Sequence, residues 1–207
     1  MQYTLYTHPF SRGMYVVWAL KECGADCQVK LVQFGGQMKS AEYLAVNPQG
    51  QVPALKVGDT VLTETLAILT FLAEQFPDKG LIPPAGSIER GEFYRWLCLS
   101  IHLEYALMDK FMQVSIDAET QKAIGYGNPD VLLDTLRNHL NGRTFILGNQ
   151  FSVLDLYFSA LIAHFTRNMP VLSADDSILQ HYAAAHLARP AFAETMAWAE
   201  QAVKEMA

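Results

Sequence analysis

The chain has 207 residues, of which 51% are hydrophobic and 17% are charged. This composition can fill the core of one large or two small domains and excludes an intrinsically disordered chain. The net charge of −6 argues against nucleic acid or an anionic membrane as the main partner, and no apolar run approaches the length of a membrane span.

The N-terminal region predicts two strands and two helices. Gln2–Thr7 alternates and is rich in Tyr, Thr and Leu, which predicts a strand rather than a signal peptide. Ser11–Cys23 predicts a helix, for which Gly24 is a suitable C-terminal stop. A second strand follows at Cys27–Phe34 and a short helix at Ser40–Leu44.

The stretch from Asn47 to Leu69 organises the rest of the chain. It begins with an Asn-Pro-Gln-Gly turn and continues with two short strands, Val52–Val57 and Thr60–Thr63. Gly58-Asp59 between them has the composition of a two-residue hairpin. Apolar residues then recur at helical spacing until Pro77 ends the helix.

Pro53 is unusual because it stands at the start of a strand and lacks a backbone N–H. A cis Val52–Pro53 bond would turn the chain sharply and expose the backbone of Val52. That strand end would offer a donor and an acceptor to an extended peptide. The helix that starts at Glu64 and Thr65 would offer N–H groups to a carboxylate.

Residues 77–87 form a Pro- and Gly-rich break, after which the whole chain reads as helical. Ser152 and Asp155 have the spacing of a capping box, so we assign them a structural role and no catalytic one. The expected helices span about 88–114, 117–124, 130–140, 152–168, 176–187 and 190–205. The element order before the break, β-α-β-α-β-β-α, is the thioredoxin-like pattern.

Ser11 is the leading candidate for chemistry, because it follows a strand and a Pro-containing loop at the first turn of a helix. By position alone, a serine there is more often a helix N-cap. Tyr6 is the rival, and its ordinary role is that of a core or cross-strand aromatic. The cysteines Cys23, Cys27 and Cys98 form no Cys-x-x-Cys pair, and the histidines show no metal-ligand spacing. We therefore expect no metal and a reducing, cytoplasmic location.

Two motifs carry a resemblance that covers essentially the whole chain. Asn-Pro-x-Gly-x-Val-Pro, followed by a hairpin and Glu64-Thr65, resembles the glutathione-binding half of the glutathione S-transferase superfamily. Tyr-Thr-His-Pro-Phe-Ser-Arg, residues 6–12, looks like the first-loop signature of its serine-type, theta- and zeta-like members. The resemblance implies an α+β protein with a thioredoxin-like βαβαββα domain (residues 1–77), a linker (78–87) and an all-helical domain (88–207).

The resemblance also assigns roles to individual residues. Ser11 matches the position whose hydroxyl donates a hydrogen bond to the sulfur of glutathione, so Ser11 is not itself the nucleophile. Val52 matches the residue whose backbone pairs with the cysteinyl unit, and Glu64 with Thr65 matches the pair that grips the γ-glutamyl end. Met38 departs from the pattern by holding the position of the usual glycine-carboxylate partner. The full set implied for glutathione is Gln51, Val52, Pro53, Glu64, Thr65 and Lys39, with Gln37 as another substitute for Met38.

The same resemblance implies a homodimeric detoxification enzyme that uses glutathione as co-substrate and needs no other cofactor. We expect the site for a small hydrophobic electrophile between the domains, lined by Phe10, Tyr105, Met108 and Met112. The alternative for the last three is a place in the core, which is the more common role of a Met/aromatic stripe at helical spacing. Two alternatives stay open. One is a non-catalytic glutathione-fold binding or scaffold protein, and the other is a glutathione-dependent isomerase or dehalogenase of the zeta type.

Overall fold

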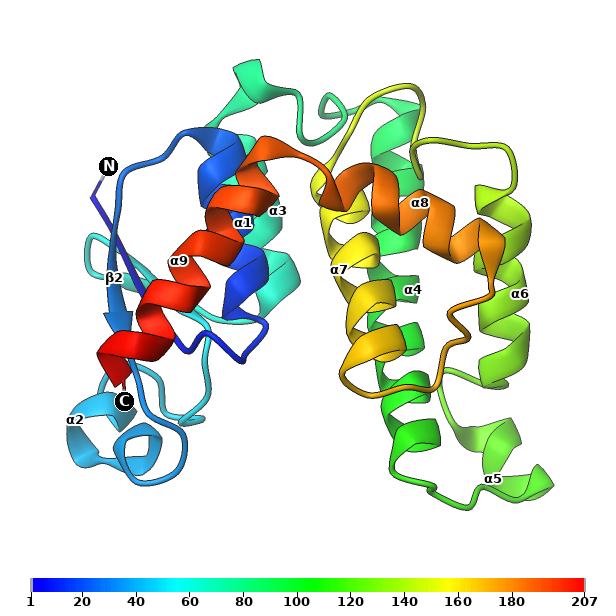
Figure 1. The fold of residues 1–207 in the computed structure, drawn as a ribbon, viewed down its shortest axis with the longest axis horizontal. Helices are drawn as coiled ribbons and strands as arrows, with labels where there is room; N and C mark the ends of the chain where they lie inside the picture. Colours follow the sequence, from blue (N-terminus) through cyan, green and yellow to red (C-terminus); the bar gives the residue numbers. More distant parts are fainter. Residues whose placement is uncertain (1, 207) are drawn as a thin grey trace. The chain divides into compact units, whose positions relative to one another are not determined.

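The computed structural model describes residues 2–206, which form two compact units (Figure 1). The first unit contains the described residues up to Lys79 together with those from Ala188 onward, and the second contains Gly80–Leu187. The first is the predicted thioredoxin-like unit, with a mixed sheet and helices, and the second is all-helical. The predicted α+β fold class is therefore confirmed.

A four-stranded sheet in the order β2-β1-β3-β4 forms the centre of the first unit. β1 (Tyr3–Thr7) pairs in parallel with β2 (Cys27–Leu31) and antiparallel with β3 (Ala54–Val57). The hairpin to β4 (Thr60–Leu62) turns at Gly58, whose φ is 59°. As predicted, two residues connect β3 to β4, and glycine provides the positive φ that this turn requires.

Helices cover both faces of this sheet because side chains of a strand alternate between the faces. Tyr3, Leu5 and Thr7 are buried on one face, where α1 (Gly13–Cys23) and α3 (Thr65–Gln75) lie against each other. The other face carries Tyr6, whose ring centroid lies 5.9 Å from that of Tyr43 on α2 (Ala41–Leu44). A turn of 3-10 helix, η1 (Gln37–Lys39), precedes α2.

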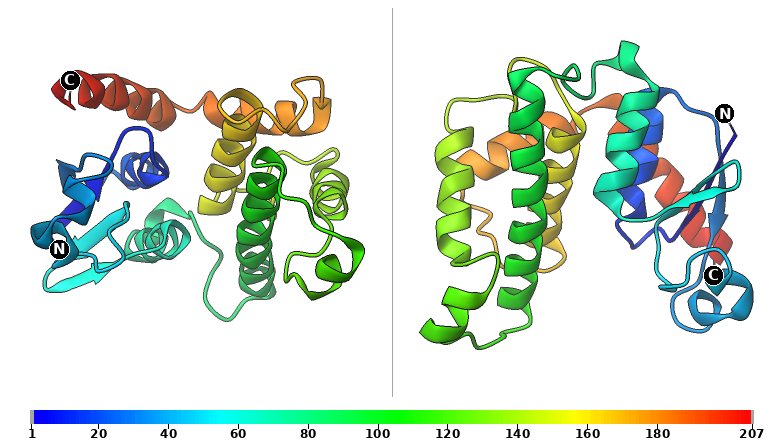
Figure 2. Two further views of the ribbon diagram at one scale, coloured as in Figure 1. Left: turned by 90° about the horizontal axis from the view of Figure 1, so that it is seen from below. Right: turned by 180° about the vertical axis from the view of Figure 1, so that it is seen from behind.

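The helix α9 (Pro190–Met206) packs against α1, which lies between α9 and α3 (Figure 2). The ring centroids of Trp18 and Phe192 are 4.8 Å apart, and the Arg189 guanidinium donates to both carboxylate oxygens of Glu22 at 2.7 and 2.8 Å. The sequence predicts one helical domain over residues 88–207. Contacts with α1 instead join α9 to the first unit, because its apolar side covers the outer side of that helix.

The second unit is built around α7 (Val153–Arg167), most of whose side chains are buried. Helices α4 (Ile88–Phe111) and α8 (Ser177–Leu187) pack against it. The predicted capping box is confirmed: the Asp155 carboxylate accepts from Ser152 N–H and Ser152 Oγ, both at 2.8 Å, and also from Ile146 N–H and Tyr182 Oη. A short connection, η2 (Pro77–Lys79), precedes this unit.

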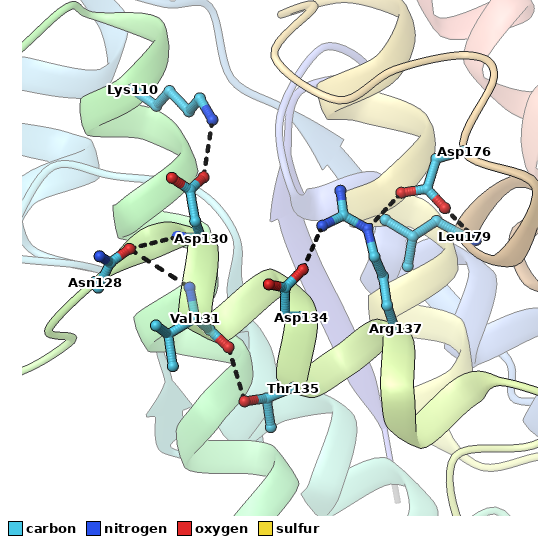
Figure 3. Close-up of polar contacts among 9 residues, drawn as sticks. All are labelled: Lys110, Asn128, Asp130, Val131, Asp134, Thr135, Arg137, Asp176 and Leu179. Atoms are coloured by element: carbon cyan, nitrogen blue, oxygen red, sulfur yellow. Dashed lines mark hydrogen bonds and ion pairs between the residues drawn. The ribbon is translucent and has the colours of Figure 1, made fainter.

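Polar contacts fix the position of α6 (Pro129–Leu140) in the second unit (Figure 3). Lys110 of α4 pairs with Asp130 at 3.2 Å, and the Arg137 guanidinium pairs with Asp134 and Asp176 at 2.9 and 2.6 Å. Asn128 caps the helix by accepting from the backbone N–H groups of its first turn. The small helix α5 (Ala118–Ala123) lies between α4 and α6 in the chain. No helix within residues 2–206 is both long and apolar enough to cross a membrane.

Candidate active site

The register of the sheet brings the three segments selected from the sequence to one end of it. Tyr6 pairs with Ala54, and Leu55 pairs with Leu62. Because β1 and β4 are both antiparallel to β3, the loop after β1, the residues before β3 and the start of α3 all meet at this end. The segments around Ser11, Val52 and Glu64 are therefore neighbours in the first unit.

Ser11 lies in the loop before α1 and is half-buried. Its hydroxyl donates to the His8 carbonyl at 2.8 Å and accepts from Gly13 N–H at 3.0 Å. The second contact satisfies one N–H at the helix start, so part of the helix-cap role of this serine is present. The His8 carbonyl also accepts from Ser11 N–H at 3.0 Å. The hydroxyl can therefore turn to a ligand while this carbonyl retains a donor.

His8 fixes the shape of the same loop. It is buried, its Nδ1 accepts from Phe10 N–H at 3.1 Å, and its ring stacks on Phe34 with centroids 3.7 Å apart. Burial lowers the pKa of His8, which favours the neutral ring that this accepting Nδ1 requires. Phe10 itself is exposed, so the loop presents an aromatic surface next to Ser11.

Tyr6 and Thr7 point to opposite faces of the sheet, since they are consecutive residues of β1. The Tyr6 ring contacts Tyr43, and Lys30 Nζ lies 5.4 Å from its centroid. Ser11 lies on the other face, because a Cβ on Gly13 would approach both Thr7 Oγ1 and Ser11 Oγ within 3 Å. This geometry favours the cross-strand role for Tyr6 and the loop position for Ser11.

The Val52–Pro53 peptide bond is cis. Pro53 is buried at the start of β3 and Val52 is half-buried. Among the described residues, the N–H and C=O of Val52 form no hydrogen bond with another backbone group outside helices and strands. They are therefore available to an extended peptide that approaches this edge.

Side chains from residues 39–47 hold the three carbonyls that precede Val52, and we call this set the carbonyl clamp. Lys39 Nζ donates to the carbonyls of Gln49 at 3.0 Å and Gly50 at 2.9 Å. Tyr43 Oη and Asn47 Nδ2 both donate to the Gln51 carbonyl, at 2.7 and 2.8 Å. Sequence reasoning missed Tyr43 and Asn47. The turn signature at Asn47 was the one signal that could have indicated a role for it.

The start of α3 combines a strained residue with unpaired donors. Glu64 has φ 64° and ψ 116°, its side chain is exposed, and it forms no helix-cap hydrogen bond. A positive φ at a non-glycine residue is uncommon and costs free energy, and strained residues of this kind cluster at functional sites. The first backbone hydrogen bond of the helix comes from Ile68 N–H, so the N–H groups of residues 65–67 are open to an anion.

Lys39 is the best substitute for the missing partner at Met38. Its side chain is exposed and its ammonium is anchored next to the residues that precede Val52, through the two carbonyls of the clamp. An ammonium carries three donors, so one proton and the charge remain for a carboxylate. Gln37 is occupied differently, because its side-chain oxygen accepts from Gln33 N–H at 2.7 Å.

The residues expected to contact an electrophile occur in both units. Phe10 belongs to the first unit and is 74% exposed. Tyr105, Met108 and Met112 lie on one side of α4 or just beyond its end in the second unit, where Tyr105 and Met112 are exposed and Met108 is half-buried. The exposure of Tyr105 and Met112 argues against a core position for these two residues.

Comparisons with known proteins agree with this architecture. The family model described as glutathione S-transferase, N-terminal domain, matches residues 1–74. The chain is 32% identical to glutathione S-transferase GstA of Escherichia coli O157:H7 over 130 residues, which are 58% of this chain and 60% of that protein. It is 38% identical to maleylacetoacetate isomerase of Pseudomonas aeruginosa over 96 residues, 43% of this chain and 44% of that protein. The chain thus spans less than two thirds of the length of these two relatives.

The similarity to solved structures extends over almost the whole chain. The structure resembles a glutathione transferase from Methylococcus capsulatus with a TM-score of 0.79 and 29% identity, covering 96% of this chain and 99% of that one. It also resembles a sphingomonad glutathione S-transferase complexed with glutathione, with a TM-score of 0.78 and 28% identity, covering 95% of this chain and 98% of that one.

Proposed function

Because this chain belongs to the glutathione S-transferase superfamily, we propose that it conjugates the glutathione thiolate to small hydrophobic electrophiles. The observation that carries the proposal is the meeting of three elements at one end of the sheet. A serine hydroxyl at a helix start, an open strand edge at Val52 and an open helix N-terminus at Glu64 and Thr65 together fit a thiol peptide.

Each part of glutathione has a matching group in this arrangement. The Val52 backbone pairs with the cysteinyl unit at the strand edge. The γ-glutamyl carboxylate meets the Thr65 hydroxyl and the open N–H groups of α3, while its ammonium meets the Glu64 carboxylate. Gln51 and Pro53 flank the cysteinyl contact, and Lys39 takes the glycine carboxylate in place of Met38.

Activation of the thiol requires only a change of partner at Ser11. A thiol with an ordinary pKa of roughly 8.5 is mostly protonated at neutral pH. The Ser11 hydroxyl turns from the His8 carbonyl to the sulfur, and the thiol proton passes to solvent. The hydrogen bond and the positive end of α1 then stabilise the thiolate. The His8 carbonyl still accepts a hydrogen bond from Ser11 N–H, so it is not left without a donor.

The thiolate then attacks an electrophilic carbon. The sulfur lone pair forms the S–C bond, and the electron pair of the broken bond leaves with the displaced group, or enters a conjugated system that solvent protonates. Phe10, which is exposed beside Ser11 in the first unit, is our candidate for a contact with the apolar part of this substrate. Tyr105, Met108 and Met112 of the second unit are candidates by the resemblance alone.

A glutathione-dependent isomerase is the second candidate, and the similarity to maleylacetoacetate isomerase of Pseudomonas aeruginosa favours it. In an isomerase, the same thiolate would add to a cis double bond and leave after rotation about that bond, so glutathione would be regenerated. The first loop, His8-Pro9-Phe10-Ser11-Arg12, lacks the Ser-x-Ser-Cys-x-x-Arg-like spacing usual in the zeta type, which favours conjugation.

The test is the thiolate absorbance of bound glutathione against pH, measured for wild type, Ser11→Ala and Tyr6→Phe. We expect a thiol pKa well below that of free glutathione, raised toward it by Ser11→Ala and unchanged by Tyr6→Phe. The absence of a saturable thiolate signal in the wild type would refute the proposal and favour a non-catalytic glutathione-binding or scaffold role. Assays with an aryl halide and with a cis-dienone acid then separate conjugation from isomerisation.

We further propose that the active form is a cytoplasmic homodimer. The support is family membership alone, and sedimentation of the purified chain with and without glutathione tests the oligomeric state. A monomer at all concentrations would contradict the dimer without affecting the glutathione site of the first unit.

A further inference from the structure

Thr7 has a buried hydroxyl that the mechanism above does not use. It is the last residue of β1, it is fully buried, and its Oγ1 is one of two buried side-chain oxygens within residues 2–206 that lack a hydrogen-bond partner. The other is Ser159 Oγ in the core of the second unit. Native proteins satisfy most buried polar groups, so a hydroxyl without a partner calls for an explanation.

The neighbour of this hydroxyl is the proposed catalytic serine. A Cβ added to Gly13 would lie 1.7 Å from Thr7 Oγ1 and 2.9 Å from Ser11 Oγ. The two oxygens are therefore no farther apart than the sum of these distances, and Thr7 Oγ1 occupies the place that a side chain at position 13 would take. The position of Thr7 is set by the sheet, where it pairs with Leu31 and its carbonyl accepts from Val32 N–H at 2.9 Å.

The Ser11 hydroxyl has room for one more donor, which Thr7 can supply. Ser11 Oγ has one proton, directed at the His8 carbonyl, and two lone pairs, of which one accepts from Gly13 N–H. When the proton turns to the sulfur of glutathione, the second lone pair remains open. Thr7 has a donor without an acceptor on the same side of the sheet. Thr7 Oγ1 is therefore the nearby donor that this lone pair could accept from.

We propose that Thr7 is a positioning residue whose hydroxyl donates to Ser11 Oγ once Ser11 donates to the glutathione sulfur. The result is a chain of hydrogen bonds, Thr7 O–H to Ser11 O–H to thiolate. Accepting a hydrogen bond polarises the Ser11 hydroxyl and makes it a stronger donor, and it holds the hydroxyl in the orientation that faces the ligand. This inference rests on the proposed function of Ser11.

The test uses Thr7→Val, which replaces the hydroxyl by a methyl group of similar shape, and Thr7→Ser, which keeps the hydroxyl. The readout is the pH titration of the thiolate absorbance of bound glutathione. Loss of one hydrogen bond in the chain should reduce the thiolate fraction at neutral pH by about two- to tenfold in Thr7→Val. Thr7→Ser should restore it, and Thr7→Val should have no further effect in the Ser11→Ala background.

Ser159→Ala is the matched control, because it removes the other buried hydroxyl without a partner and should leave the titration unchanged. Circular dichroism and urea unfolding verify that each variant folds, and Thr7→Val should be at least as stable as wild type. If Thr7→Val titrates like wild type while Ser11→Ala does not, the inference is wrong and the proposed function stands. If neither variant changes the titration, both fail.

Discussion

The carbonyl clamp predicts that Tyr43 and Asn47 act together on the backbone before Val52. Both side chains donate to one oxygen, the Gln51 carbonyl, at 2.7 and 2.8 Å. Tyr43→Phe removes one donor and leaves the ring packed near Tyr6. Asn47→Ala removes the other donor and also the Oδ1 that accepts from Gln49 N–H at 3.1 Å. Burial raises the pKa of Tyr43 to about 12, so its phenol is a donor at any practical assay pH.

The expected magnitudes follow from the number of partners that each variant leaves. After Tyr43→Phe the carbonyl retains Asn47, so the variant should lose about 0.5–1.5 kcal/mol, the net value of one neutral hydrogen bond. Asn47→Ala breaks two hydrogen bonds and should cost about 2 kcal/mol. In the double variant neither donor remains, and we expect an additional loss of about 1 kcal/mol beyond the sum of the single effects.

Urea unfolding of the four proteins measures this coupling, and calorimetric titration with glutathione measures its consequence at the site. Since the clamp fixes the residue before Val52, glutathione affinity should fall in the same order as stability, by about fivefold for each kcal/mol lost from the clamp. Strictly additive effects on stability, together with an unchanged affinity in the double variant, would refute the reasoning that the clamp organises the strand edge.

Three further predictions concern other parts of the structure. Glu64→Gly should be at least as stable as wild type in urea unfolding, because the release of about 1–3 kcal/mol of backbone strain offsets the roughly 0.5–1 kcal/mol cost of glycine. The same variant loses the carboxylate and should bind glutathione at least about tenfold more weakly in calorimetric titration. The lowered pKa of His8 means that the unfolded chain binds this proton more readily. The free energy of unfolding should therefore rise with pH up to about 6.5. His8→Asn keeps an acceptor for Phe10 N–H and should flatten this dependence when unfolding is measured at several pH values. Asp155→Ala should cost about 3 kcal/mol or more and lower Tm, because Ser152 and Ile146 lose their buried acceptor.

Each of these predictions has a control and a contrary outcome. Glu64→Gln keeps the backbone strain, so equal gains in stability from Gln and Gly would contradict the strain argument. An unchanged pH dependence in His8→Asn would mean that His8 does not contribute to it. Asp175→Ala, on an exposed residue, should leave Tm unchanged, and an equally small effect of Asp155→Ala would contradict the role of the capping box.

Features encoded by a few consecutive residues could be predicted from the sequence. Gly24 has φ 65° at the end of α1, Gly58 turns the hairpin, and Ser152 starts α7, each as expected from local turn and cap chemistry. The ends of elements were less accurate. β2 ends at Leu31 rather than Phe34, and α4 ends at Phe111 rather than Val114.

What could not be predicted depends on residues that meet only in the folded chain. Tyr43 looked like an ordinary residue of a short helix, and nothing local indicates that its hydroxyl reaches the Gln51 carbonyl. The close approach of Thr7 and Ser11 to Gly13 results from packing a helix start against a strand end. The contact of Trp18 with Phe192 likewise joins positions that no periodic pattern connects.

The membership of α9 in the first unit has a consequence for the order in which the chain can fold during synthesis. Translation produces β1 to α3, then all of the second unit, and only then the helix that covers α1. At typical elongation rates, the outer side of α1 waits on the order of ten seconds for Phe192 and Arg189 to emerge. During that interval Trp18 lacks its cover, and the nascent first unit is a natural client for a chaperone.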